Sequence, residues 1–202
     1  MAWCGADIVV LDVKSDEYAL LIDLADAIRP AGSHGAILAD AETLEDLKEV
    51  GLVGEVSQGI ARQPIPKRSG EIACDGTPSA PALAAAFFNG FVSTAEFHRK
   101  DMAGLVESAT KRSARVRRTS HELAARLTLA FQTVQPWIPF EGDCLQRGFM
   151  LHQQLRRGGV PARWVFGVRT WPFLAHCWVQ VEDLIVGDSL ERVSGFTPIM
   201  AV

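Results

Sequence analysis

The stretch "CLQRGFMLHQQLRRGGVPARWVFGVRTWPFLAHCWVQVEDLIVGDS", residues 144–189, decides the fold of the carboxyl-terminal part of this 202-residue chain. Its beginning has helical spacing: Gly148, Leu151 and Leu155 follow Cys144 on one side, and glycines and a proline end the pattern after residue 157. The next residues are typical of a strand, and residues 172–188 are typical of a β-hairpin. A helix followed by antiparallel strands predicts an α+β fold.

The predicted helix begins at or next to Cys144, which places a thiol at a helix amino terminus. The positive end of the helix dipole stabilises a thiolate and lowers the pKa of such a cysteine. A buried structural cysteine is the alternative, and it is the commoner fate of a cysteine in general. Helix position leaves both interpretations open.

The hairpin carries His176 and, twelve residues later, Asp188. A two-residue turn at 182–183 sets Asp188 opposite Cys177, so that His176 faces away from the carboxylate. A three-residue turn at 181–183 instead sets His176 opposite Asp188 on the same face. Neither turn has the glycine or asparagine that short hairpin turns prefer. The sequence favours the three-residue turn, and with it the His–Asp pair, only slightly.

A nucleophile on a helix amino terminus, followed by histidine and aspartate on adjacent strands, is the arrangement of papain-like and transglutaminase-like enzymes. Here the chain resembles the lasso-peptide B protein, the leader peptidase of lasso-peptide biosynthesis, which has a transglutaminase-like core. The specific match is "GVRTWPF.AH.WV", with "GD" twelve residues after the histidine and "FTPI" near the end of the chain. The resemblance is strong from Cys144 onward and weak over the helices before it.

The resemblance implies that Cys144, His176 and Asp188 are the catalytic residues of a cysteine peptidase without a cofactor, and no His or Cys spacing supports a metal site. It also implies two partners, namely the lasso-peptide precursor, whose leader is bound and cleaved, and a separate ATP-dependent lasso cyclase. A transglutaminase-like acyltransferase and a non-catalytic leader-binding adaptor are the alternatives. The chain departs from the family pattern, where serine, alanine, glutamate and asparagine are expected, at Gly148, Cys177, Gln180 and Gly187.

Cys177 shares the strand with His176 but faces the other way, so we expect it to be a packing residue.

The first part of the chain, residues 1–62, has the pattern of a small separate module. Two apolar runs, 8–13 and 18–22, flank the polar "KSDE" and predict a hairpin, and helical spacing follows over 24–30 and 40–53. This part resembles the winged-helix module that recognises the leader peptide in the same family. In such modules the leader adds as a strand to the edge of the sheet. We therefore expect leader contacts from Tyr18, Leu20, Ile22, Leu47 and Lys48.

The charge of this module argues against nucleic acid. Residues 1–62 hold 12 Asp and Glu against 4 Lys and Arg, a balance of −8, whereas the rest of the chain has a balance of +4. Winged helices commonly bind DNA, but phosphates repel so acidic a surface. The basic run "KRSARVRR", 111–118, has no interleaved aromatic residues and is expected to be a solvated surface. We expect no nucleic-acid partner.

Prolines and glycines mark residues 63–81 as a linker with neither helix nor strand, which leaves 82–202 as the peptidase domain. No segment approaches the roughly 18 apolar residues of a membrane span, and no basic region precedes the first apolar run as in a signal peptide. The four cysteines have no disulfide-framework spacing. We expect a cytoplasmic protein with reduced thiols and no membrane association.

Overall fold

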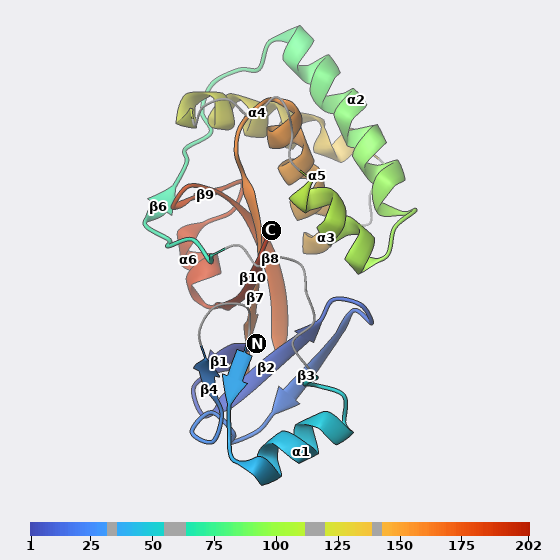
Figure 1. Cartoon of the computed structure of the whole chain (residues 1–202). Coiled ribbons are helices and arrows are strands. Elements are labelled where there is room, and N and C mark those ends of the chain that lie inside the picture. The colour runs from blue at the N-terminus through green and yellow to red at the C-terminus, as the bar shows by residue number, and fades with distance from the viewer. Residues whose placement is uncertain (32–35, 55–63, 112–119, 139–142) are drawn as a thin grey trace.

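The computed structural model describes residues 1–31, 36–54, 64–111, 120–138 and 143–202. A central sheet joins two regions: most of the helices gather at one end of its strands, and a small amino-terminal module lies at the other end (Figure 1). Helices and antiparallel strands are therefore combined in one chain, and the predicted α+β class is confirmed.

The central sheet has five strands in the order β10-β7-β8-β9-β6. All neighbours in it are antiparallel except β6 and β9, which run parallel. The strands are β6 (Gly70–Glu71), β7 (Arg163–Arg169), β8 (Leu174–Val181), β9 (Leu184–Val186) and β10 (Thr197–Ala201). The strand predicted after Pro161 and both strands of the predicted hairpin are present.

The helices of this region are α2 (Ala80–Phe97), α3 (Met102–Thr110), α4 (His121–Val134), α5 (Cys144–Arg157) and α6 (Leu190–Ser194), with a 3₁₀ turn at Gln135–Trp137. The predicted helix amino terminus at Cys144 is confirmed. Helix α4 is capped by Ser120, whose side chain accepts a hydrogen bond from the Leu123 N–H.

The two faces of the central sheet bury different cores. Helix α5 packs across β7 and β8, and Phe149, Trp164 and Cys177 belong to the larger core on that side. On the other face, Val193 of α6 packs with Trp178 and its neighbours in a smaller core. Because side chains alternate along a strand, Cys177 and Trp178 of β8 face opposite cores.

The segment predicted to be a structureless linker contributes a strand to the central sheet. Gly70 and Glu71 form β6, which pairs with Leu184 and Ile185 of β9. Just before it, the Arg68 guanidinium donates to the carbonyl oxygens of Val193 and Phe196, at 2.7 and 3.0 Å. Local composition could not reveal this pairing, because the partner strand lies more than a hundred residues away.

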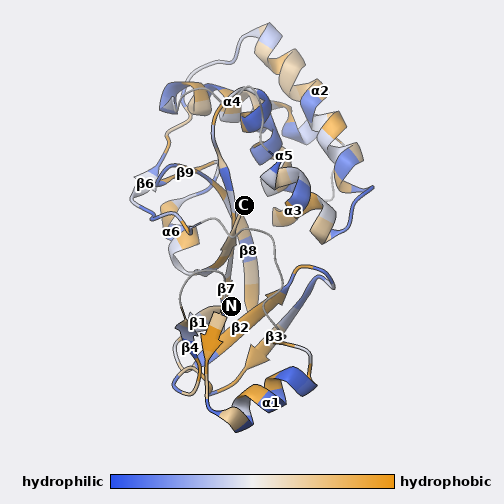
Figure 2. Cartoon of the chain, in the orientation of Figure 1, coloured by the Kyte–Doolittle hydropathy of each residue, from blue (hydrophilic) through white to orange (hydrophobic). Residues whose placement is uncertain are grey.

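The amino-terminal module contains two antiparallel sheets and one helix among its described residues. The first sheet has the order β1-β2-β3, and the second joins β4 and β5. The elements are β1 (Ala2–Cys4), β2 (Asp7–Asp12), β3 (Glu17–Leu21), β4 (Arg29–Ala31), β5 (Ala36–Leu38) and α1 (Ala41–Glu49). Figure 2 shows β2 and β3 as mainly hydrophobic, which fits their position between the small core and the rest of the protein.

The predicted hairpin over residues 8–22 and the helix within residues 40–53 are confirmed, but the helix over 24–30 is wrong. Residues 24–28 make a single turn, in which Leu24 O accepts from Ile28 N, and the chain then extends into β4. Pairing between β4 and β5 overrides the local spacing. The winged-helix assignment of this module stays a prediction.

The module packs directly on the central sheet. Ala2 and Val9 belong to the same buried core as Phe166 and Cys177, and the Trp171 indole N–H donates to Asp7 Oδ2 at 2.7 Å. Most of the predicted basic surface, residues 112–118, lies outside the described residues. Within the described ranges, no helix has the length and apolar character needed to cross a membrane.

Candidate active site

The site begins with Cys144, the first residue of helix α5. Asp143 caps this helix: its Oδ1 accepts a hydrogen bond from the Gln146 N–H at 2.6 Å. The backbone N–H of Cys144 itself lies in the first turn, where the helix supplies no acceptor. The thiol is half-buried. A capped helix start therefore presents, at the same point, a thiol and a backbone N–H that has no acceptor within the helix.

His176 and Asp188 meet at a short distance: the ring Nε2 lies 2.7 Å from Asp188 Oδ2. Both side chains are largely buried, with 9% and 13% of their surfaces exposed. The other carboxylate oxygen, Oδ1, accepts from the Ser189 N–H at 2.8 Å. Asp188 is thus fixed through both oxygens, and it orients the histidine ring.

His176 and Asp188 do meet, but the hairpin does not have the register that the sequence favoured. Val181 pairs with Leu184 and Val179 with Val186, so the turn has two residues and the three-residue turn is wrong. Continued, this ladder would set Asp188 opposite Cys177. Instead, β9 ends at Val186, and Gly187 adopts a left-handed φ of 73° that redirects the chain. Asp188 therefore leaves the ladder and reaches the histidine.

His176 also contacts the Cys144 thiol by a hydrogen bond. Because Asp188 occupies Nε2, the ring nitrogen that remains for the thiol is Nδ1. The ring is held on its other sides by aromatic groups: its centroid lies 5.2 Å from that of Phe196 and 6.2 Å from that of Trp178. The arrangement has the order thiol, imidazole, carboxylate.

The electrostatics of this group favour a thiolate and an imidazolium. Hydrogen bonds from Cys177 and His176 outweigh burial and lower the pKa of Cys144 to about 4. Burial opposes the charged ring of His176, but Asp188 and Cys144 more than compensate and raise its pKa to about 9. Burial likewise opposes the charge of Asp188, and the hydrogen bond from His176 still lowers its pKa. At neutral pH the site holds a charged nucleophile beside its proton donor.

Comparison with known proteins agrees with this geometry. Residues 92–201, more than half of the chain, match the model of the transglutaminase-like superfamily. The chain belongs to the transglutaminase-like superfamily. A stretch of 50 residues is 38% identical to the Microcin J25-processing protein McjB of Escherichia coli. That stretch covers 25% of this chain and 24% of McjB, so the match spans about a quarter of that curated relative. No solved structure matches significantly.

The transglutaminase-like domain contains one neighbour of the nucleophile that sequence reasoning assigned to packing alone. Cys177 does face away from Trp178 and is 5% exposed, as expected for a core residue. However, helix α5 begins over that face, and Cys177 Sγ lies 3.0 Å from the carbonyl oxygen of Cys144. The Cys177 thiol also hydrogen-bonds to the Cys144 thiol. The alternation of the strand was predicted correctly, and the position of the helix start above it was not.

Gly148, a departure from the expected serine, fits this arrangement. A Cβ at this position would lie 2.6 Å from Trp164 Nε1 and 3.1 Å from Cys177 Sγ. The indole Nε1 is fully buried and has no conventional hydrogen-bond partner. Its interaction with the Cys177 sulfur acts to lower the pKa of that thiol, against the larger effect of burial. The space that a serine side chain would need is therefore taken by the Cys177 thiol and the Trp164 indole.

Among the residues expected to contact a leader, Tyr18 lies nearest to this site. Its ring makes an edge contact with Phe173, with centroids 5.5 Å apart. Burial raises the pKa of Tyr18 to about 12, and the charges of Cys177, Asp16 and Cys144 add to the increase. Tyr18 belongs to β3, an edge strand of its sheet.

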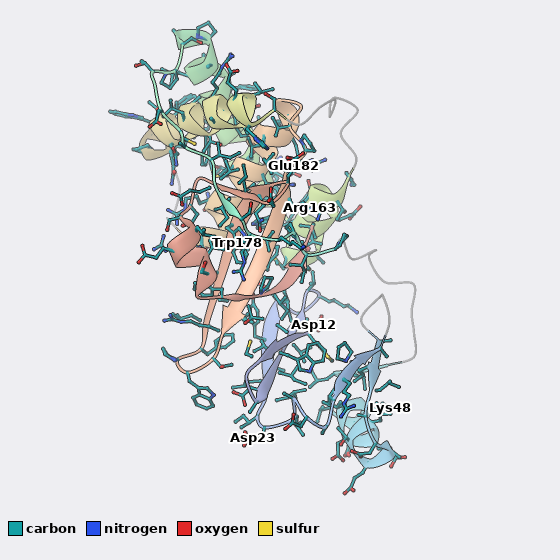
Figure 3. All side chains as sticks on the ribbon, turned by 90° about the vertical axis from the view of Figure 1, so that its left-hand side faces the viewer. Asp12, Asp23, Lys48, Arg163, Trp178 and Glu182 are labelled. Atoms are coloured by element: carbon teal, nitrogen blue, oxygen red, sulfur yellow. The ribbon has the colours of Figure 1, made fainter. Side chains whose placement is uncertain are left out.

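The other expected leader contacts have different environments. Leu20 packs against the larger core, and Leu47 is 3% exposed in the small core of the module. Ile22 is exposed and lines a hollow of about 700 Å³ between the module and the central sheet, together with Arg169 and Trp171. Lys48 is exposed on α1, away from the central sheet that carries Trp178 and Glu182 (Figure 3). Leu47 thus supports α1 from inside, and the exposed side chains are those of Ile22 and Lys48.

Within the described residues, no group of three or more His, Cys, Asp or Glu side chains is arranged to hold a metal ion.

Proposed function

We propose that this protein is the leader peptidase of a lasso-peptide pathway, which binds a precursor through its leader and cleaves the leader off through a thioester. The observation that carries the proposal is the Cys144 thiol at the start of α5, paired with His176 and Asp188. Membership of the transglutaminase-like superfamily and the local similarity to a microcin-processing protein support it.

The first half of the reaction forms the thioester. The Cys144 thiolate attacks the carbonyl carbon of the last leader residue, and the free backbone N–H of Cys144 donates to the developing oxyanion. His176 then gives its Nδ1 proton to the departing amine, which becomes the new amino terminus of the core peptide. Asp188 keeps the ring oriented and stabilises its charged form throughout.

The second half releases the leader. The neutral His176 accepts a proton from a water molecule, and the resulting hydroxide attacks the thioester carbonyl. The carbon–sulfur bond breaks, the leader departs with a carboxylate, and the Cys144 thiolate and imidazolium are restored. One water molecule is consumed for each bond cleaved.

The amino-terminal module, residues 1–62, is the proposed leader-binding unit. Among the residues that the structure describes, strand β3 pairs on one side only, so an extended peptide can add to its other edge through main-chain hydrogen bonds. A leader on this edge passes Tyr18, whose pKa is raised in part by the charges of Cys177 and Cys144. This position connects binding of the leader to cleavage at its end. Ile22 and Lys48 are the exposed contacts proposed further along, with Leu20 and Leu47 holding the strand and helix in place.

The proposed division of the chain is the leader module, a joining segment over residues 63–81 and the peptidase domain over 82–202. The proposed partners are the precursor peptide and an ATP-dependent cyclase that uses the new amino terminus. This role places the protein in the cytoplasm, where thiols stay reduced.

A mass-spectrometric assay tests the proposal. The precursor encoded beside this gene is incubated with wild-type protein, with Cys144→Ala and with Cys74→Ala, the last being a half-buried cysteine outside the site. We expect leader release by wild type and by Cys74→Ala, none by Cys144→Ala, and leader binding by all three.

Two other outcomes contradict the proposal in different ways. Products that gain the mass of an added amine, with no hydrolysis, establish a transglutaminase-like acyltransferase. Binding without cleavage by any of the three proteins establishes a leader-binding adaptor.

A further inference from the structure

The catalytic thiol has a second thiol as its neighbour. Cys177 Sγ is 3.0 Å from the carbonyl oxygen of Cys144, and the two thiols also share a hydrogen bond. A thiol has a single proton, so Cys177 can donate either to the carbonyl or to the sulfur of Cys144. A thiolate is the better acceptor, because hydrogen bonds to charged groups are the stronger ones.

The two thiols differ in exposure and in charge. Cys144 is half-buried and is reached from the solvent, whereas Cys177 is 5% exposed. Burial raises the pKa of Cys177 well above its ordinary range, and the hydrogen bond and charge of Cys144 add to this. An oxidant from the solvent therefore reaches Cys144 first and meets it as the reactive thiolate, whereas Cys177 is a buried, protonated thiol next to it.

We propose that the Cys144–Cys177 pair is an oxidation site, at which a hydroperoxide converts the nucleophile into a reversible disulfide with Cys177. The inference rests on the reactive Cys144 of the proposed function, but its readout below does not require precursor cleavage.

The chemistry has two balanced steps. In the first, the Cys144 thiolate attacks one oxygen of hydrogen peroxide, the O–O bond breaks, and hydroxide leaves, giving a sulfenic acid and, after protonation, water. In the second, the Cys177 thiol gives up its proton as its sulfur attacks the Cys144 sulfur, and a second water departs as the S–S bond forms. Peroxide is reduced and the two cysteines are oxidised. A dithiol then cleaves the S–S bond by thiol–disulfide exchange, which restores both cysteine thiols and leaves the dithiol as a cyclic disulfide.

The surroundings of Cys177 suit a resolving role. Because Gly148 has no side chain, the Cys177 sulfur packs directly against α5, one helical turn after Cys144. Cys177 is also joined by its backbone to His176, and its own backbone N–H donates to the Cys144 thiol. The disulfide would consume the nucleophile and stop leader cleavage, and it would protect Cys144 from the irreversible sulfinic acid.

Peptide mapping tests the inference in the wild-type protein. The reduced protein is treated with an equimolar amount of hydrogen peroxide, its remaining thiols are blocked with N-ethylmaleimide, and it is digested with trypsin without reductant. Cleavage after Arg and Lys places Cys144 in the peptide 127–147 and Cys177 in 170–192, while Cys4 and Cys74 fall in other peptides. We expect these two peptides joined with the loss of two hydrogen atoms, and their separation by dithiothreitol.

A paired variant sharpens the result. Both proteins are treated in parallel with about ten equivalents of hydrogen peroxide, because a sulfinic acid consumes two equivalents for each thiol. Dithiothreitol should then restore more than about half of the starting activity of wild type. It should restore less than about a tenth of that of Cys177→Ala, whose Cys144 proceeds to sulfinic acid. Each protein is compared with its own untreated sample.

Cys144 recovered as sulfinic acid in wild type, with Cys177 blocked by maleimide, would overturn the inference, as would a link from Cys144 to Cys4 or Cys74. Failure of the reduced protein to cleave any precursor would count against the proposed function instead, because the joined peptide forms regardless.

Discussion

Replacing Asp188 with asparagine removes one negative charge from the His176 pair and keeps the size of the side chain. Both partners are largely buried, so water and salt screen their interaction little. The pKa of His176 rises from an ordinary 6.5 to about 9. At about 1.4 kcal/mol for each pKa unit, this rise corresponds to about 3 kcal/mol.

Asp188 is the larger of the two groups that raise the pKa of His176, and Cys144 is the other. Removing the charge of Asp188 is therefore expected to destabilise the imidazolium form of His176 by about 2 kcal/mol and to lower kcat about thirty-fold. The pH profile should change as well. The thiolate–imidazolium pair exists between the pKa of Cys144, about 4, and that of His176, about 9. Without Asp188 the upper boundary falls, and activity is lost at a lower alkaline pH.

The assay is leader release from the precursor, measured by mass spectrometry across the pH range, with the alkylation rate of Cys144 by iodoacetamide as a second readout. Asp183→Asn is the matched control, because this exposed aspartate lies in the turn of the same hairpin. It should keep the wild-type rate and profile. An Asp188→Asn protein that keeps more than about half of the wild-type kcat, with an unchanged alkaline limit, would refute the reasoning.

Three further changes have expected results. Gly148→Ser should lower the free energy of unfolding, measured by urea denaturation, by about 1–3 kcal/mol, because the new Cβ would meet Trp164 and Cys177. Gly54→Ala is the control, since nothing lies within 4 Å of a Cβ at that position. Adding Cys177→Ala to Gly148→Ser should restore part of the lost stability. Burial lowers the pKa of His152 from 6.5 to about 3. Below about pH 6.5 the unfolded chain therefore binds more protons than the folded protein, so the free energy of unfolding decreases as the pH is lowered. From pH 7 to pH 5 wild type should lose about 2 kcal/mol more than His152→Gln, and equal losses would contradict this. Tyr18→Ala should lower kcat/KM for the precursor about ten-fold, Tyr18→Phe much less, and neither should change Cys144 alkylation; a changed alkylation rate would place Tyr18 in the chemistry instead of in leader binding.

Local patterns predicted the elements that carry the site, and long-range contacts decided what the patterns left open. The start of α5 follows from the helical spacing after Cys144, and the strand after Pro161 follows from its apolar run. The hairpin register was wrong because its turn is held from elsewhere. Glu182 adopts a left-handed φ of 57° without being glycine or asparagine, and the distant Ser69 bonds to Asp183 through its N–H and its hydroxyl.

The same physical reason explains the other differences. Strand β6 exists because β9 offers it an edge, and residues 24–30 are not helical because β4 pairs with β5. Strand periodicity correctly set Cys177 on the face opposite His176. Its contact with Cys144 depends on where α5 crosses the sheet, which is a property of the packing of two elements and not of either sequence alone.

The proposed function depends on attack by the Cys144 sulfur on the carbonyl at the end of a bound leader. A synthetic copy of the precursor's leader, ending in a vinyl sulfone in place of the scissile bond, tests this directly, because it captures the sulfur that reaches that position. We expect one label per protein, located by mass spectrometry in the peptide 127–147 on Cys144 and lost when unmodified leader competes. A bound leader that leaves Cys144 unlabelled, or a label on another residue, would contradict it.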